Sequence, residues 1–293
     1  MRSYVRLAIL CTTLMLAACG KDESTGSIPQ TNNNVVATSL LNVAYGTDAA
    51  QKMDIYLPAN RNTASTKTIV LIHGGAWSSG DKADFNSFVD TLKRRLPTYA
   101  IANINYRLAA APATNTFPTQ EQDVKAAFDF IASKSNEFII SNKTVALGAS
   151  AGAHLALLQS YKYNSNNNIK AVVDLFGPTD MTAMYNDPAS PLAPSSSIAL
   201  LLNGTPASNA TLYNSSSPIN FVTSSTIPTI IFHGGSSDFL VKTSQSTALR
   251  DKLVQNNITV QYTIYPNEGH GWTGSNLIDT FNKIESFLTQ YVQ

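Results

Sequence analysis

The pentapeptide Gly148-Ala149-Ser150-Ala151-Gly152 places a serine between two glycines, in the pattern G-x-S-x-G. Such a serine can be a nucleophile where the chain turns sharply, because the turn projects its hydroxyl away from the backbone. Glycine permits that turn because it has no Cβ to clash. The apolar run 145–147 precedes the pentapeptide and a helical pattern follows it, which is the strand–turn–helix context that this chemistry requires. We therefore predict that Ser150 is a catalytic nucleophile.

A serine nucleophile needs a neighbouring base, and the sequence offers four histidines. His154 lies one turn after Ser150 on the same expected helix, so it should point into the packing of that helix. His73 and His233 each end an expected strand and precede Gly-Gly, which is typical of an imidazole that bonds nearby backbone. His270 lies in a glycine-flanked loop after the last expected strand, where it can reach over the edge of the sheet. We predict His270 as the base.

The base in turn needs a carboxylate that orients the imidazole and stabilises its cation. Asp238 lies in the loop after the strand that precedes the last one, and the order Ser, Asp, His occurs in known serine hydrolases. Asp180 is the alternative, since it follows the preceding strand and some hydrolases place the acid there. Either carboxylate could instead cap a turn or a helix. We predict Asp238.

Hydrolysis of an acyl group also needs N–H donors for the oxyanion that forms. The N–H of Ala151, at the start of the expected helix, would face that oxyanion. A second donor is expected where Gly74-Gly75 follows the expected strand 68–72, because glycines let the backbone approach a substrate closely. Two glycines after a strand can be only a tight turn, but their occurrence together with Ser150 favours an oxyanion hole.

These residues require a sheet whose strands end at one edge. Short apolar, β-branched runs alternate with longer helical patterns, which predicts an α/β fold with a mostly parallel sheet of about eight strands and helices on both faces. The expected parallel strands are 68–72, 100–106, 144–147, 171–176, 229–232 and 260–265, and the expected helices are 83–96, 119–133, 151–161, 242–255 and 275–291. Two earlier runs, 40–45 and 53–57, predict an antiparallel hairpin at the sheet edge.

Residues 179–227 lack this periodicity and are rich in Ser, Asn, Pro and Ala. No second core is evident there. We therefore predict one domain over residues 35–293, with 179–227 as an insertion over the carboxyl ends of the strands and a candidate lid.

The N-terminus resembles a bacterial lipoprotein signal peptide, residues 1–18. Arg2 and Arg6 precede an apolar stretch of about a dozen residues, too short for the roughly 20 that span a bilayer. Ala17 and Ala18 precede Cys19, as in a lipobox, so we expect Cys19 to be acylated. An ordinary secretory peptide with an accidental cysteine is the alternative. The polar stretch 19–34 predicts a flexible tether, which would place the domain on the periplasmic or cell-surface side of the outer membrane.

The composition limits the classes of molecule that the protein is expected to bind. Only 13% of the residues are charged and the net charge is +1, so no basic stripe for nucleic acid is expected. The only cysteines are Cys11 and Cys19, which leaves the domain without a thiol for a disulfide or a metal site. The membrane would be contacted through the N-terminal lipid alone, and the sequence does not predict an oligomeric state.

With these residues in place, the chain resembles α/β-hydrolases of the hormone-sensitive-lipase-like and bacterial feruloyl-esterase-like groups, from residue 42 to the C-terminus. The matching motifs are His73-Gly74-Gly75-Ala76-Trp77 with Gly80-Asp81-Lys82, Asn105-Tyr106-Arg107-Leu108, Phe117-Pro118 with Asp123-Val124-Lys125-Ala126-Ala127, Ser217-Pro218-Ile219, and His233-Gly234 with Asp238 and Val241. The resemblance implies a lone esterase domain that needs no metal or cofactor, with oxyanion donors from Gly74, Gly75 and Ala151. Ala76 stands where the family has a third glycine, and Ala149 where it often has Asp or His.

The expected function is hydrolysis of small carboxylic esters through an acyl-enzyme, on extracellular substrates such as acylated polysaccharides. Trp77 and Trp272 flank the catalytic loops, where they would contact an aromatic or sugar group or serve only in packing. A serine peptidase is one alternative, although the chain has no room for the propeller domain that usually gates such enzymes. A non-catalytic binding protein on the same fold is the other.

Overall fold

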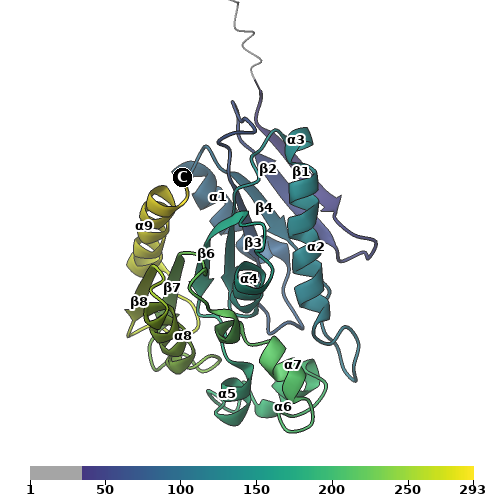
Figure 1. Cartoon of the computed structure of the whole chain (residues 1–293), viewed down its shortest axis with the longest axis vertical. Helices are drawn as coiled ribbons and strands as arrows, with labels where there is room; N and C mark the ends of the chain where they lie inside the picture. The colour runs from purple at the N-terminus through teal and green to yellow at the C-terminus, as the bar shows by residue number, and fades with distance from the viewer. Residues whose placement is uncertain (1–34) are drawn as a thin grey trace, which may run out of the picture. The chain divides into compact units, whose positions relative to one another are not determined.

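In the computed structural model, which describes residues 35–293, these residues form one sheet of eight strands (Figure 1). The strands are β1 (Thr38–Ala44), β2 (Lys52–Leu57), β3 (Thr68–Ile72), β4 (Ala100–Ile104), β5 (Thr144–Ala149), β6 (Ile169–Leu175), β7 (Thr229–Gly234) and β8 (Val260–Tyr265). Their order across the sheet is β1-β2-β4-β3-β5-β6-β7-β8. The pairs β1–β2 and β2–β4 are antiparallel, and all pairs from β4 to β8 are parallel. The carboxyl ends of β3 to β8 therefore meet at one edge.

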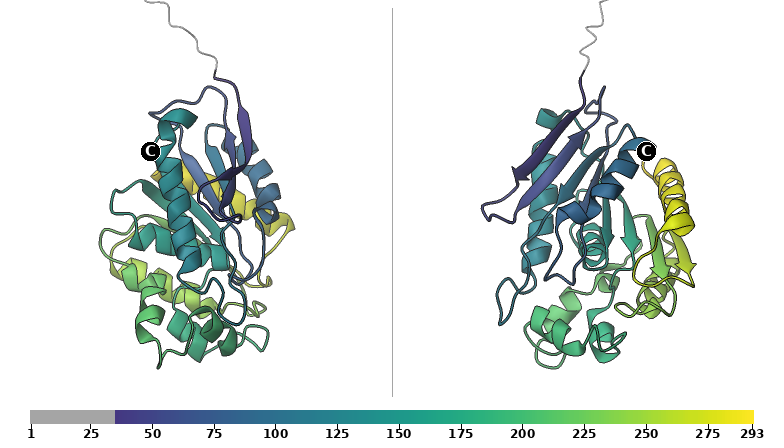
Figure 2. Two further views of the ribbon diagram at one scale, coloured as in Figure 1. Left: turned by 90° about the vertical axis from the view of Figure 1, so that its right-hand side faces the viewer. Right: turned by 180° about the vertical axis from the view of Figure 1, so that it is seen from behind.

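Helices cover both faces of this sheet. The apolar side chains of α2, α4 and α8 pack in one core cluster, and those of α1 and α9 pack in a second cluster on the other face. Figure 2 shows α1 and α9 from behind, on the side opposite α4. The helices and 3-10 turns are η1 (Lys82–Phe85), α1 (Asn86–Arg95), α2 (Thr119–Ser133), α3 (Ser135–Phe138), α4 (Ala151–Lys162), α5 (Met181–Asn186), α6 (Ser195–Leu201), α7 (Ala210–Ser215), η2 (Pro218–Phe221), α8 (Thr243–Gln255) and α9 (Gly274–Tyr291).

The central strands are buried on both faces because their side chains alternate between the two clusters. On β3, Ile69 and Leu71 belong to the cluster under α1 and α9, whereas Val70 and Ile72 belong to the cluster under α2 and α4. All five residues of β3 are buried. A parallel strand covered on both faces reads as a continuous apolar run, which is why the sequence predicts these strands well.

The predicted elements are confirmed, with shifts at their ends. The hairpin at the sheet edge is present as β1 and β2. The strand predicted to reach residue 106 ends at Ile104, and the side-chain amide of the next residue, Asn105, donates to Asp81 at 2.7 Å. The helix predicted from residue 83 begins as the 3-10 turn η1, whose first N–H groups are capped by the carboxylate of Asp81.

The segment 179–227 folds into α5, α6, α7 and η2 beyond the carboxyl ends of the strands (Figure 1). Its buried apolar side chains, among them Met181, Ile198, Leu202 and Tyr213, join the cluster that also contains the core residues of α2 and α4. The segment therefore shares the core of the domain. Its role as a lid stays a prediction.

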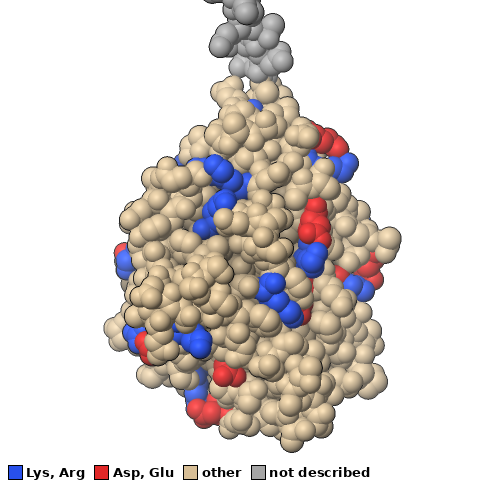
Figure 3. Space-filling model, viewed as in Figure 1, with Lys and Arg blue, Asp and Glu red and all other residues tan. Residues whose placement is uncertain are grey.

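The surface carries few charges. Figure 3 shows Lys, Arg, Asp and Glu scattered over one face between broad uncharged areas. None of the helices within residues 35–293 combines the length and the apolar character needed to cross a membrane. The signal peptide, Cys19 and the tether lie outside the described residues.

Asp174 is a carboxyl group buried within the sheet, on β6. Its side chain is inaccessible to solvent, its Oδ1 accepts the N–H of Gly177 at 2.7 Å, and its Oδ2 has no partner among the described residues. Burial raises the pKa of Asp174 to about 7, and the bond from Gly177 offsets only part of that effect. Between about pH 4 and pH 7 the folded protein therefore keeps a proton on Asp174 that the unfolded chain has already lost.

We expect Asp174→Asn to stabilise the protein increasingly as the pH rises from about 4, the ordinary aspartate pKa, to about 7. Between these values the unfolded state binds fewer protons than the folded state, so the stability of the wild type falls with pH, and the amide removes this dependence. Urea unfolding at several pH values measures the difference, with Asp90→Asn, an exposed carboxylate on α1, as the control. Parallel stability curves for wild type and Asp174→Asn would contradict the expectation.

Candidate active site

Ser150 lies in a sharp turn between β5 and α4. Its φ of 55° and ψ of −122° are unusual for a residue with a side chain, and its N–H donates to the carbonyl of Leu175 at 2.9 Å. The turn is tight because α4 begins directly above the end of β3. A Cβ at Gly152 would lie 1.9 Å from the carbonyl oxygen of Ile72, and a Cβ at Gly148 would lie 2.2 Å from the carbonyl oxygen of Gly152. Both glycines of the pentapeptide are therefore required by close backbone contacts.

His270 and Asp238 are brought together by the loops after β8 and β7. The Nδ1 of His270 lies 2.9 Å and 3.0 Å from the two carboxylate oxygens of Asp238. Because a carboxylate only accepts, Nδ1 carries a proton, and in the neutral imidazole Nε2 is then left with a lone pair. Nε2 has no partner among the described residues.

Hydrogen bonds keep Asp238 ionised although its side chain is buried. Burial alone would raise the pKa of Asp238, but the bond from His270 and the N–H groups of Val241 and Leu240, at 2.9 Å and 3.0 Å, lower it below its usual value. The carboxylate is thus held in the charged form that a neighbouring imidazolium would need.

The two loops touch through glycine. A Cβ at Gly234 would lie 2.0 Å from the carbonyl oxygen of Gly269, and the N–H of Gly235 donates to the carbonyl of Glu268 at 2.8 Å. A side chain at Gly234 would push the loop of Asp238 away from the loop of His270.

The other three histidines have structural partners, as the sequence predicts. His154 is fully buried, accepts the indole N–H of Trp77 at 3.1 Å and lies 2.7 Å from the carbonyl oxygen of Ser216, and burial lowers its pKa to about 4. The Nδ1 atoms of His73 and His233 lie 2.7 Å and 2.9 Å from the carbonyl oxygen of the glycine that follows each.

Asp180, the alternative acid, caps α5 and accepts the N–H of Ala183 at 2.8 Å. The carboxylate beside His270 is that of Asp238 and not that of Asp180.

Tyr106 fixes the orientation of the Gly74-Gly75 backbone. Its hydroxyl donates to the carbonyl oxygens of His73 at 2.9 Å and Gly74 at 3.2 Å, and its ring stacks on His73 at 4.3 Å. In a trans peptide the N–H points away from the preceding carbonyl, so the N–H groups of Gly74 and Gly75 point away from Tyr106. Among the described residues, no backbone carbonyl accepts the N–H of Gly75 or of Ala151. Both groups are free to bind an oxyanion.

The role of Tyr106 is not evident from the sequence, because the partners of its hydroxyl lie more than 30 residues away along the chain. Its place in the motif Asn105-Tyr106-Arg107-Leu108 is the only signal that singles it out. The next residue, Arg107, binds the buried Asp123 of α2 at 2.6 Å, which anchors this part of the chain.

Ser150 and His270 line one cavity of about 490 Å³, which also exposes Gly74 and Gly75. Its outer wall comes from the segment 179–227, including Met184, Leu192 and Ile198. The structure therefore brings the predicted nucleophile, the predicted base and the two glycines of the expected oxyanion hole to one space, and Ala151 directly follows Ser150 at the start of α4. No hydrogen bond joins Ser150 to His270 among the described residues, and such bonds are often long before substrate binds.

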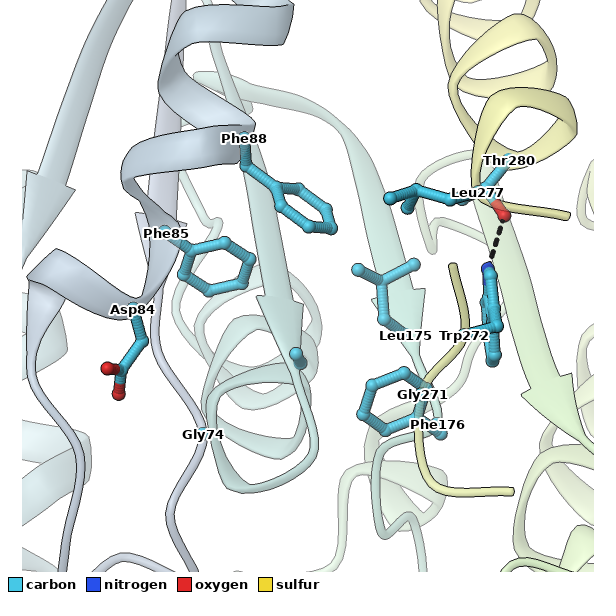
Figure 4. Close-up of a pocket in the computed structure, with 11 residues that line it drawn as sticks. Gly74, Asp84, Phe85, Phe88, Leu175, Phe176, Gly271, Trp272, Leu277 and Thr280 are labelled. Atoms are coloured by element: carbon cyan, nitrogen blue, oxygen red, sulfur yellow. Dashed lines mark hydrogen bonds between the residues drawn. The ribbon is translucent and has the colours of Figure 1, made fainter. Parts of the chain in front are cut away.

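The two tryptophans line different cavities. Trp77 contributes to the wall of the larger cavity, but its side chain is only 3% exposed and its N–H is bound by His154. Trp272 lines a second, smaller cavity of about 210 Å³, and its N–H donates to Thr280 at 2.8 Å (Figure 4).

The chain is similar in sequence and in structure to proteins that include named esterases. Esterase LipC of Mycobacterium tuberculosis is 25% identical over 267 residues, which are 85% of this chain and 64% of that protein. A solved bifunctional GH43-CE from Bacteroides eggerthii is 26% identical with a TM-score of 0.72, over 85% of this chain and 38% of that chain. A truncated carbohydrate esterase from gut microbiota is also 26% identical with a TM-score of 0.72, over 88% of this chain and 97% of that chain.

The chain thus spans 64% of the mycobacterial protein and 38% of the Bacteroides chain. Its fold is that of the α/β-hydrolases, as in these neighbours. The BD-FAE family model matches residues 53–253, which is well over half of the sequence. The chain therefore belongs to the BD-FAE family.

Proposed function

We propose that this protein is a serine carboxylesterase in which Ser150, His270 and Asp238 form the catalytic triad. One observation carries the proposal: His270 is bound to Asp238 through Nδ1 while its Nε2 is unpartnered, and it lines the same cavity as Ser150. This is the protonation state in which an imidazole can accept the proton of a serine hydroxyl. Membership of the BD-FAE family supports it.

In the first half-reaction the Oγ of Ser150 attacks the carbonyl carbon of the ester and passes its proton to Nε2 of His270. The carbonyl oxygen becomes an oxyanion, which the N–H groups of Gly75 and Ala151 bind. The ionised Asp238 stabilises the imidazolium. The tetrahedral intermediate then collapses, the bond to the alcohol oxygen breaks, and that oxygen takes the proton from Nε2.

In the second half-reaction water replaces the alcohol. His270 accepts a proton from the water as its oxygen attacks the acyl carbon bound to Ser150. The same N–H groups bind the second oxyanion. When the bond to Ser150 breaks, the proton returns from His270 to the serine oxygen and the carboxylic acid leaves.

The substrate we propose is a small acyl ester of a carbohydrate outside the cell. The solved carbohydrate esterase from gut microbiota, at 26% identity, supports this class. The lipobox-like sequence before Cys19 supports a location outside the cytoplasm, because it would anchor the domain to the cell envelope.

We expect a fluorophosphonate probe to label the wild type and to leave Ser150→Ala unlabelled, because the probe reacts only with an activated serine. Ser197→Ala is the matched control, since Ser197 lines the same cavity away from the turn and its loss should leave the labelling intact. Absence of labelling on the folded wild type would reject the esterase and favour a binding protein.

We expect Tyr106→Phe to lower kcat for p-nitrophenyl acetate with little change in KM, by about tenfold, which is less than the ~10²–10³ for losing an oxyanion donor itself. The hydroxyl positions the Gly75 N–H and touches no substrate, so the loss should appear at the transition state. Tyr45→Phe is the control, because the Tyr45 hydroxyl binds the backbone carbonyl of Asn105 instead. Equal effects of both changes on kcat would reduce Tyr106 to a structural role.

We expect full-length protein expressed in a bacterium with lipoprotein processing to incorporate an alkyne-labelled fatty acid and to fractionate with membranes. Cys19→Ser should abolish both, whereas Cys11→Ser should abolish neither, because only Cys19 lies at the expected cleavage site. Labelling that survives Cys19→Ser would contradict the proposed anchor.

A further inference from the structure

Two cavities meet beside Ser150. Gly74, Asp84, Ala149 and Phe176 line both of them. Ser150 and His270 line only the larger one, of about 490 Å³, and the smaller one, of about 210 Å³, extends between α1 and α9. An ester bound at Ser150 therefore has two spaces of different size for its two halves.

The geometry of the proposed reaction decides which half enters which space. The tetrahedral carbon carries four groups: the oxygen of Ser150, the oxyanion, the leaving oxygen and the acyl chain. The oxyanion must face Gly75 and Ala151, and the leaving oxygen must face Nε2 of His270 to receive its proton. The alcohol therefore lies on the side of the cavity that His270 lines. The acyl chain has to take the remaining direction, past Gly74 and Ala149.

We propose that the smaller cavity binds the acyl part of the substrate and that Phe88 and Leu277 set the length of acyl chain it accepts. This inference rests on the proposed esterase function. Phe88 comes from α1 and Leu277 from α9, and Figure 4 shows them reaching toward one another at the end of the cavity away from Gly74. A chain that enters beside Gly74 meets these two side chains last.

The lining of the smaller cavity selects an uncharged, apolar chain. Its walls are mostly aromatic and aliphatic, from Phe85, Phe88, Leu175, Phe176, Trp272 and Leu277. The hydroxyl of Thr280 donates to the carbonyl of Asn276 at 2.8 Å and accepts the N–H of Trp272 at 2.8 Å, so it has little capacity left for a polar substituent. The carboxylate of Asp84 at the junction of the cavities repels an anionic acyl group.

Aromatic contacts and a hydrogen bond hold the walls of the smaller cavity near Phe88 and Leu277 in place. The ring of Phe88 packs against the rings of Phe85 and Phe281, with 4.9 Å between the ring centroids in each pair. Trp272 contacts Phe176 at 5.3 Å and is tied to α9 through Thr280. A change of volume at Phe88 or Leu277 should therefore alter the length of the cavity and leave its entrance at Gly74 in place.

The test uses p-nitrophenyl esters from acetate to decanoate, in which the alcohol is constant. Phe88→Ala should raise the ratio of kcat/KM for decanoate to that for acetate by about tenfold or more, because it opens the end of the cavity. Leu277→Phe should lower the ratio by about tenfold or more, because it fills that end. Hydrolysis of the acetate by both variants reports that each is folded.

Two controls separate this inference from the proposed function. Ile278→Phe adds the same ring at the neighbouring, 57% exposed position of α9 and should leave the acyl-length ratio unchanged. A series of acetates of different alcohols should show the same relative rates in wild type, Phe88→Ala and Leu277→Phe.

The outcomes are distinct. Unchanged acyl-length ratios in both variants, or a change in alcohol preference instead, would overturn the assignment of the cavities while the esterase stands. If the wild type hydrolyses none of the esters, the proposed function fails first and this inference fails with it.

Discussion

The close passage of α4 over the end of β3 is the contact on which the candidate site depends. At Gly152 the two backbones are so near that a Cβ would lie 1.9 Å from the carbonyl oxygen of Ile72. Because β3 and β5 are neighbours in the sheet, this contact places the turn at Ser150 beside the loop that begins at His73. The strained φ of Ser150 is sustained by these packed elements. The contact between α4 and the end of β3 therefore positions both the nucleophile and the oxyanion donors.

The loops after β3 and β7 share one local arrangement of a histidine and the glycine that follows it. His73 and His233 each end a strand, and each places Nδ1 against the carbonyl oxygen of the glycine that follows. In the first loop the hydroxyl of Tyr106 binds the same Gly74 carbonyl, and the Gly75 N–H points the opposite way, whereas in the second loop Gly234 lies against the backbone of Gly269. Two similar sequences, His-Gly-Gly, thus support different roles, since the elements packed against them differ.

What the sequence predicts and what it leaves open follow from the range of the interactions. The strands could be predicted because burial on both faces makes each an apolar run, and the predicted order of the loops brings His270 and Asp238 to one edge. The role of Tyr106 could not be predicted, since its hydroxyl binds carbonyls more than 30 residues away. The cavities are equally non-local, because α1, β6 and α9 each supply part of the smaller one. Pattern and periodicity predict elements, whereas such spaces depend on how the elements pack.

The electrostatics around Asp238 show why a buried carboxylate can serve a single histidine although two lie near it. The Nε2 of His233 is 3.8 Å from Asp238, and burial lowers the pKa of His233, so that imidazole is neutral. Its proton is on Nδ1, bound toward the carbonyl of Gly234, and its Nε2 therefore has no hydrogen to offer Asp238. The carboxylate is left to His270 and to two backbone N–H groups. A protonated His233 would compete for that charge and weaken the orientation of His270, so the burial that lowers the pKa of His233 protects the pairing that the proposed chemistry requires, and the contact of Nδ1 with the carbonyl of Gly234 fixes which nitrogen faces Asp238.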